Sequence, residues 1–176
     1  MSTYNNKPEV QVAGFEAAAW EGYEALANQV SVHLEKNPQA VIAIDCYPGV
    51  LLGELNQALE QHLPSLQAVH VEKALKGEEE IHAMIARNLT DDRVRGVMSH
   101  HALIEFFDET QLCELRTAIE TQQQETPVVV IGTGATLACT PSLLIYADMP
   151  RWEIQLRYRD SRVANFGASN FGEDFL

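Results

Sequence analysis

An acid and two glycines follow an apolar run early in the chain, in an arrangement that can bind an anion. The stretch Val41 to Gly53 reads VIAIDCYPGVLLG, so Asp45 ends the apolar run and Gly49 lies in the turn after it. This order is typical of a buried parallel strand that leads through a tight loop into a helix. In such a unit, loop amides and the helix dipole converge where a phosphate can bind. We therefore take Asp45, Gly49 and Gly53 as candidate phosphate-binding residues.

The same loop lacks the two side chains that phosphoryl transfer requires. A working phosphate loop places a lysine on the β- and γ-phosphates and a serine or threonine on magnesium. When Cys46 is aligned with the first glycine of that pattern, Leu52 falls at the lysine and Gly53 at the hydroxyl. The spacing therefore argues against phosphoryl transfer and leaves two interpretations open, a structural turn and a loop that binds an anion.

A second pair of glycines follows the strongest strand signal of the chain. Four β-branched residues, VVVI, precede Gly132, Thr133 and Gly134. Glycines at the end of a strand let a ligand approach the backbone, and they equally permit a tight turn toward the next element. Both interpretations stay open, and Gly132 and Gly134 join the candidate site.

Arginines gather near the C-terminus of a chain that has few basic residues. Arg151, Arg157, Arg159 and Arg162 fall within twelve positions. One interpretation is a lid that closes over a phosphate, since arginine pairs strongly with such anions. The alternative is a solvated helix surface, on which Glu153 and Arg157 form an i,i+4 ion pair. We take Arg151, Arg157 and Arg159 as the candidate lid residues.

Neither a metal site nor a catalytic group follows from the remaining reactive residues. His100 and His101 are adjacent, so on a strand they would point to opposite faces. Glu105 lies four residues after His101 and could pair with it on a helix. Three scattered cysteines fit neither a disulfide framework nor a zinc site. We therefore predict no metal and no cofactor, and we assign no catalytic residue.

Alternating strands and helices must position these residues. Apolar patterns predict strands over 41–45, 66–72, 128–131 and 143–147, and helices over 15–36, 52–63, 77–89, 108–126 and 150–159. Residues 94–101 fit either a short strand or a loop. We divide the chain into a loose lead-in (1–14), an α/β domain (15–160) and a tail (161–176) that begins a missing segment. The alternation predicts a three-layer α/β sandwich with a mostly parallel sheet, whose ligands bind beyond the carboxyl ends of the strands.

Composition and charge restrict the partners of the chain. The 176 residues include 25 acids and 12 basic residues, for a net charge of −13. Such a charge argues against binding to nucleic acid or anionic membranes, which depends on Lys and Arg contacts to phosphate. No apolar run approaches the roughly 20 residues of a membrane helix, and the N-terminus has no signal pattern. We expect a cytoplasmic protein.

Three blocks of the sequence resemble a known kind of domain: VIAIDCYPGVLLGEL, DDRVRGVMSHHALIEFFD, and VVVIGTGATL with LLIYADMPRWEIQLRYR. They are similar to the N-terminal region of bacterial class I mannose-6-phosphate isomerase-like proteins, in which a nucleoside-kinase-like α/β domain precedes a cupin isomerase domain. The resemblance covers about residues 41–172. More distantly, the blocks resemble uridine-kinase-like P-loop kinases. This resemblance implies a P-loop-like fold with a degenerate phosphate loop, and it places any isomerase chemistry, with its metal ligands, outside this chain.

The resemblance and the missing side chains together lead to one expected function. We expect a non-catalytic or regulatory domain of a sugar-phosphate-metabolism protein, which binds a phosphorylated sugar or nucleotide. One alternative is a small-molecule kinase for a nucleoside or sugar, with an atypical phosphate loop. The other is a structural or oligomerisation module, which associates with further copies of itself or with a C-terminal domain outside this chain.

Overall fold

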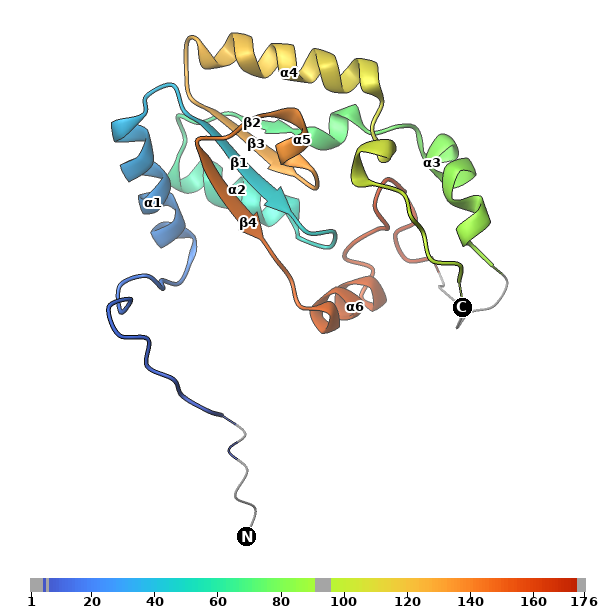
Figure 1. The fold of residues 1–176 in the computed structure, drawn as a ribbon, viewed down its shortest axis with the longest axis horizontal. Coiled ribbons are helices and arrows are strands. Elements are labelled where there is room, and N and C mark those ends of the chain that lie inside the picture. Colours follow the sequence, from blue (N-terminus) through green and yellow to red (C-terminus); the bar gives the residue numbers. More distant parts are fainter. Residues whose placement is uncertain (1–4, 6, 91–95, 174–176) are drawn as a thin grey trace.

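Four parallel strands form one sheet at the centre of the protein (Figure 1). The computed structural model describes residues 5, 7–90 and 96–173. The order of strands across the sheet is β2-β3-β1-β4, and every neighbouring pair is parallel. The strands are β1 (Val41–Cys46), β2 (Ala68–His70), β3 (Val128–Gly132) and β4 (Leu143–Ala147). The expected α/β class and parallel sheet are confirmed.

The two central strands are those with the most continuous apolar sequence. All five residues of β3 are buried, as are five of the six residues of β1. Uninterrupted burial of this kind is typical of a parallel strand that is covered on both faces. In the register, Asp45 lies beside Gly132 on one side and beside Tyr146 on the other. The loops after β1 and β3 therefore leave the sheet next to each other at its carboxyl edge.

Helices cover both faces of the sheet, which gives three layers. Helices α1 (Tyr23–Lys36) and α2 (Leu52–His62) pack on the face that contains Ile42 and Ile44. Helices α4 (Glu109–Gln123) and α5 (Ala135–Ala138) pack on the face that contains Ala43 and Val130. Further along the carboxyl edge lie α3 (Glu78–Ile85), α6 (Arg151–Arg159) and three short 3-10 helices, η1 (Val71–Ala74), η2 (Ala86–Asn88) and η3 (Leu103–Phe106).

The first helix is shorter than its apolar spacing predicts. The expected helix over 15–36 begins at Tyr23, because turns interrupt the chain at 13–14 and 16–17 and Gly22 has a φ of 89°. Phe15, which fits the helical spacing, is 66% exposed. Helical periodicity alone does not form a helix where no core packs against the apolar side.

Other boundaries differ from expectation in smaller ways. The strand expected over 66–72 is limited to β2, because the chain after His70 winds into η1 and buries Val71 and Ala74. The helix expected over 77–89 is α3 continued by η2, and the helix expected over 108–126 is α4, in which the Asp108 carboxylate caps the Gln111 amide at 2.8 Å. Helix α5 had no sequence signal. Residues 94 and 95 lie outside the described part of the chain, and 96–102 form neither a helix nor a strand.

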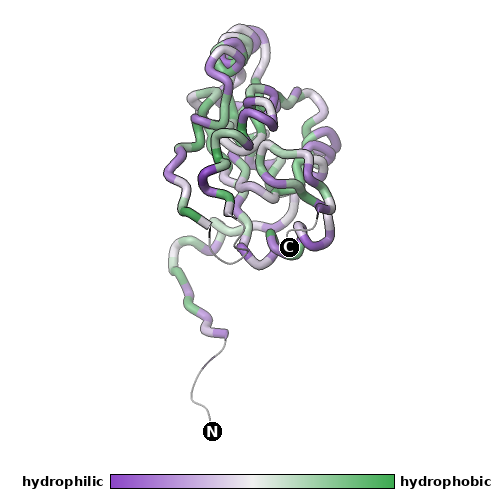
Figure 2. Tube along the Cα trace, turned by 90° about the vertical axis from the view of Figure 1, so that its right-hand side faces the viewer, coloured by the Kyte–Doolittle hydropathy of each residue, from purple (hydrophilic) through white to green (hydrophobic). Residues whose placement is uncertain are grey.

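Hydropathy along the backbone agrees with this layering. Figure 2 shows apolar residues within the body of the domain and a segment near the N-terminus that extends away from it. In the described ranges, 5, 7–90 and 96–173, we find no helix with both the length and the apolar character needed to cross a membrane.

Candidate functional site

A cleft of about 620 Å³ lies at the carboxyl edge of the sheet. Its walls are the segment from Cys46 to Glu54, Glu72 from η1, Thr133 after β3, and residues 162–167 with Phe171. The chain turns from β1 into α2 on one face and from β3 into α5 on the other. Loops that diverge to opposite faces open a crevice in α/β sheets, where ligands commonly bind. The cleft is therefore where the fold class predicts a site.

Asp45 uses its carboxylate to hold the second glycine loop. Its Oδ1 accepts a hydrogen bond from the Gly134 amide at 3.0 Å. Its Oδ2 accepts from the Thr136 amide at 3.2 Å and from the Thr136 hydroxyl at 2.6 Å. The structure thus brings Asp45 and Gly134 together, as the shared sheet edge predicts. The Asp45 carboxylate thus accepts hydrogen bonds from amides that a bound anion would otherwise contact.

Glu72 packs against the other glycine of that loop. Glu72 Oε1 accepts a hydrogen bond from the Thr133 amide at 3.1 Å. Gly132 has a φ of 128°, and a Cβ there would collide with the Glu72 carboxylate. Gly132 therefore permits both a tight turn and a close approach, but the group that approaches is the protein's own carboxylate. Spacing in the sequence could not reveal Glu72, since it lies 61 residues from Thr133.

The position of the Glu72 carboxyl disfavours its charged form. Burial raises its pKa, since removal from water disfavours the charged form. The atom Oε2 is buried, and within the described residues no group donates a hydrogen bond to it. Burial likewise raises the pKa of the Cys46 thiol to about 12, so this cleft residue is no thiolate nucleophile near neutral pH.

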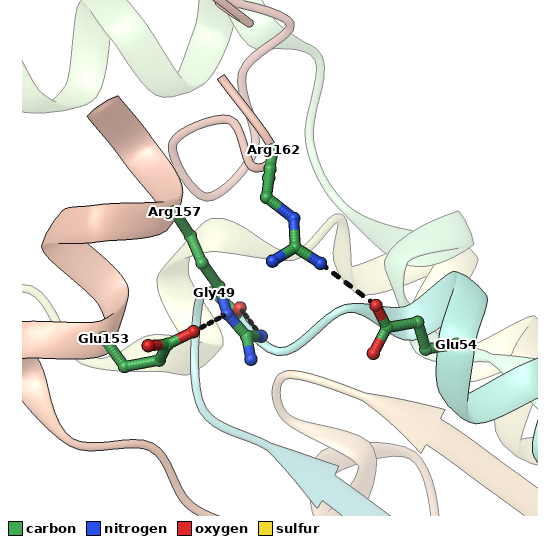
Figure 3. A network of polar contacts seen from close by, with 5 residues as sticks. All are labelled: Gly49, Glu54, Glu153, Arg157 and Arg162. Atoms are coloured by element: carbon green, nitrogen blue, oxygen red, sulfur yellow. Dashed lines mark hydrogen bonds and ion pairs between the residues drawn. The ribbon is translucent and has the colours of Figure 1, made fainter. Parts of the chain in front are cut away.

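Arg157 contacts the loop after β1 through a backbone carbonyl. Its Nη1 donates to the Gly49 oxygen at 2.9 Å and its Nε to Glu153 Oε1 at 2.9 Å (Figure 3). The expected Glu153–Arg157 ion pair is confirmed. Gly49 has a φ of 100°, and a Cβ there would press on Ile154 of α6. The guanidinium thus connects α6 to the loop, and its Nη1 and Nε both donate to acceptors within the protein.

The other two arginines of the expected lid point elsewhere. Arg151 and Arg159 are exposed, and neither lines the cleft in the described part of the chain. The Arg159 guanidinium lies 5.7 Å from the centre of the Trp152 ring, in a cation–π contact on the surface of α6.

The arginine that does line the cleft is Arg162. Its Nη2 lies 3.1 Å from Glu54 Oε1, in the first turn of α2, and the side chain is 48% exposed (Figure 3). Gly53 lines the cleft in the same turn. Helix α2 begins without a side-chain cap among the described residues, and Leu52 and Gly53 of its first turn line the cleft. The arginine cluster is visible in the sequence, but the choice of Arg162 depends on how the chain returns after α6.

The segment after α6 forms one wall of the cleft because it packs on the domain. The Phe166 ring lies 5.7 Å from the Phe106 ring and 6.4 Å from the Phe107 ring, measured between centroids. Further on, the Ser169 amide donates to Glu78 Oε1 at 3.0 Å. Described residues of the expected tail are therefore held against η3 and α3.

The histidine motif forms a local hydrogen-bonded pair with an acid. His101 Nδ1 lies 2.6 Å from Glu105 Oε2, so the expected pairing of these residues is confirmed. Among the described residues, we find no cluster of three or more His, Cys, Asp or Glu side chains that could hold a metal ion.

Comparisons with known proteins identify a family and add no activity. A search of curated proteins finds no match to this sequence. The chain belongs to the family described as "Domain of unknown function (DUF8485)", whose model matches residues 22–176.

Proposed function

We propose that this domain binds a phosphorylated sugar or nucleotide in the cleft at the carboxyl edge of the sheet, without transferring its phosphoryl group. The observation that carries the proposal is that one cleft contains both hydrogen-bond donors for an anion and a carboxylate that can accept hydrogen bonds. Arg162 and the first turn of α2 offer hydrogen-bond donors and positive potential. Glu72 offers a carboxylate oxygen that has no donor among the described residues. A phosphate ester with free hydroxyls matches both.

The phosphate end of the ligand would bind between Arg162 and α2. The amides of Leu52 and Gly53 lie in the first turn, where no acceptor within the helix is in reach. They and the helix dipole favour an anion at this end. Arg162 now pairs with Glu54, which is exposed, so a phosphate could replace that partner with a stronger, bidentate one.

The hydroxyl end of the ligand would bind near Glu72. Leaving a buried acceptor without a donor costs about 1–3 kcal/mol, and a ligand hydroxyl would recover it. The Glu72 side chain is half-buried and lines the cleft. Thr133 and Asn165 add polar groups to the same cleft, and Tyr47 and Phe171 add aromatic faces at its edge.

The side chains of the cleft favour binding over chemistry. Leu52 and Gly53 occupy the positions of the lysine and hydroxyl of a working phosphate loop. Asp45 already accepts three hydrogen bonds from Gly134 and Thr136, so its carboxylate holds the loop after β3. We propose that the domain descends from P-loop kinases of the uridine-kinase type. We further propose that it has a regulatory role in sugar-phosphate metabolism, since it resembles the N-terminal region of isomerase-like proteins.

A thermal-shift and calorimetric screen tests this proposal. The ligands are mannose 6-phosphate, fructose 6-phosphate, UTP and ATP, with mannose and fructose as controls without a phosphate. We expect at least one phosphorylated compound to raise the melting temperature and its parent sugar or nucleoside to have little effect. Failure of all of them at millimolar concentration would overturn the proposal and leave the structural module.

Two variants locate the ligand within the cleft. Arg162→Gln should weaken binding about tenfold or more, because it removes a charge-assisted contact to the phosphate. Arg151→Gln is the matched control, since Arg151 is exposed and lies outside the cleft. Equal effects of the two changes would show that only net charge matters. Turnover of Mg-ATP with any sugar or nucleoside would instead support the kinase alternative.

A further inference from the structure

The segment before α1 leaves the domain and exposes apolar side chains. Residues 7–19 extend away from the sheet in both views of the fold (Figures 1 and 2), whereas Trp20 and Gly22, next to α1, line a pocket with Ile145 and Ala147 of β4. The large apolar residues of this segment are at least about half exposed: Val10 82%, Val12 63%, Phe15 66% and Trp20 49%. We call residues 7–22 the arm. Leaving such side chains in water forfeits about 1.5–3 kcal/mol each relative to burial.

Strand β4 presents a complementary surface. It is the last strand in the order β2-β3-β1-β4, so one of its edges has no neighbouring strand within residues 7–90 and 96–173. Leu144 is 54% exposed and Tyr146 is 59% exposed, on the face that α4 and α5 cover elsewhere. The sequence of β4, LLIYA, contains no charged residue and no proline, which are the usual protections of a free edge. An unprotected edge of this kind can pair with a further strand.

The total surface of the chain supports the same conclusion. Its accessible area is 12526 Å² at a mass of 19.6 kDa. A compact monomer of that mass exposes about 8,600 Å², so the chain exposes about 3,900 Å² more than expected. A stable complex buries about 800 Å² on each partner. The extended arm is one source of this excess, and an interface between two copies would cover part of it.

We propose that the arm of one copy adds as a strand to the free edge of β4 in a second copy, and that the exchange is reciprocal. Val10 and Val12 are two residues apart, as are Leu144 and Tyr146, so both pairs match the two-residue repeat of a strand. Side by side on one sheet face, they cover each other while the backbones form hydrogen bonds. A twofold dimer makes this contact twice.

The second copy is a better occupant of this edge than the arm of the same chain. The arm joins α1, which packs on the sheet face of Ile42 and Ile44. Leu144 and Tyr146 lie on the opposite face, in register with Ala43 and Asp45. Figure 1 shows the arm leading away from the sheet. Arm and edge also occur in one chain, so two copies satisfy both without another partner.

Sedimentation of the full chain over a range of concentrations tests the proposal. We expect a dimer, and we expect the double variant Val10→Glu with Val12→Glu to raise its dissociation constant about tenfold or more, because charges would be buried at the new edge. Gln11→Glu is the matched control. It adds a charge to the same arm, on the side that points away from Leu144 and Tyr146.

A mixing experiment identifies the surfaces in contact. Leu144→Glu damages the edge but leaves the arm intact, whereas the double arm variant does the reverse. A mixture of the two chains restores one of the two contacts, so heterodimers should form that neither chain forms alone. Circular dichroism and the melting temperature confirm that each variant is folded, and the arm variant, which changes no buried residue, remains informative if Leu144→Glu is not. A monomer at every concentration, or a dimer equally tolerant of the double arm variant and of Gln11→Glu, would overturn the proposal.

Discussion

Asp45 and Thr136 are joined by the shortest hydrogen bond in the glycine loop, 2.6 Å from the Asp45 carboxylate to the Thr136 hydroxyl. The same carboxylate also accepts from the amides of Gly134 and Thr136. An acid from the end of β1 therefore occupies the amides that a phosphate would use in the loop after β3. A place for a ligand remains in the cleft between α2 and Arg162.

The first prediction concerns that carboxylate. Asp45→Asn should lower the free energy of unfolding by about 1.5–3 kcal/mol, because the new amide group meets donors where the carboxylate accepted hydrogen bonds. Urea denaturation measures the change. Asp148→Asn is the control, since Asp148 is exposed and accepts only from the amide next to it among the bonds described. An unchanged stability with a loss of ligand binding would instead mean that Asp45 faces the ligand.

The second prediction concerns Gly132. Gly132→Ala should destabilise the fold by about 1–3 kcal/mol, because a Cβ is strained at a φ of 128° and collides with the Glu72 carboxylate. Adding Glu72→Ala to this variant should recover part of the loss by removing the collision. Gly77→Ala is the control, since Gly77 has a φ of −60° and open space around the Cβ position. Without recovery in the double variant, the close packing of Glu72 would be refuted.

The third prediction follows from the raised pKa of Glu72. A carboxyl whose pKa is higher in the folded than in the unfolded protein binds more protons when folded, so its contribution to stability is full below the unfolded pKa. That contribution is lost as the pH rises from the ordinary value of 4.5 through the raised pKa. Glu72→Gln should therefore remove part of the fall in stability over this window. Denaturation of both proteins at several pH values measures it, with exposed Glu60→Gln as a control that should keep the wild-type slope.

The fourth prediction separates a structural arginine from a binding one. Arg157→Ala should lower the free energy of unfolding by about 1–2 kcal/mol, because the Gly49 carbonyl and Glu153 lose their donor. Arg151→Ala, on the same helix but exposed, should have little effect. Thermal unfolding compares the two. If Arg157→Ala left stability intact and abolished phosphate binding, the lid interpretation of α6 would be correct after all.

The sequence predicted the parts of this fold whose signals are local. The buried runs at 41–46 and 128–132 and the acid-capped helix after Asp108 are each encoded by adjacent or helically spaced residues. The spacing of apolar residues alone could not distinguish α1 from the turns before it, since Phe15 and Tyr23 follow the same helical spacing. What distinguishes them is the presence of a core beside one and solvent beside the other.

The site depends on contacts between distant residues, which leave no periodic trace in the sequence. Arg162 and Glu54 lie 108 residues apart, and Asp45 and Gly134 lie 89 apart. The candidate glycines were placed at the correct edge because the fold class alone fixes where parallel strands end. The path of the chain through Glu72 decides which acids accept hydrogen bonds from the amides of these loops. Its path through Ser161 decides which arginine lines the cleft.

The strand order has a consequence for how the chain is made. Both partners of β1 come late, since Val41 pairs with Val128 and Ile42 pairs with Leu143. During synthesis, the apolar run of β1 leaves the ribosome long before either neighbour exists, and pairing between such remote segments is slow. The nascent chain must therefore keep this run shielded, by α1 and α2 or by a chaperone, until residues 128–132 have been translated.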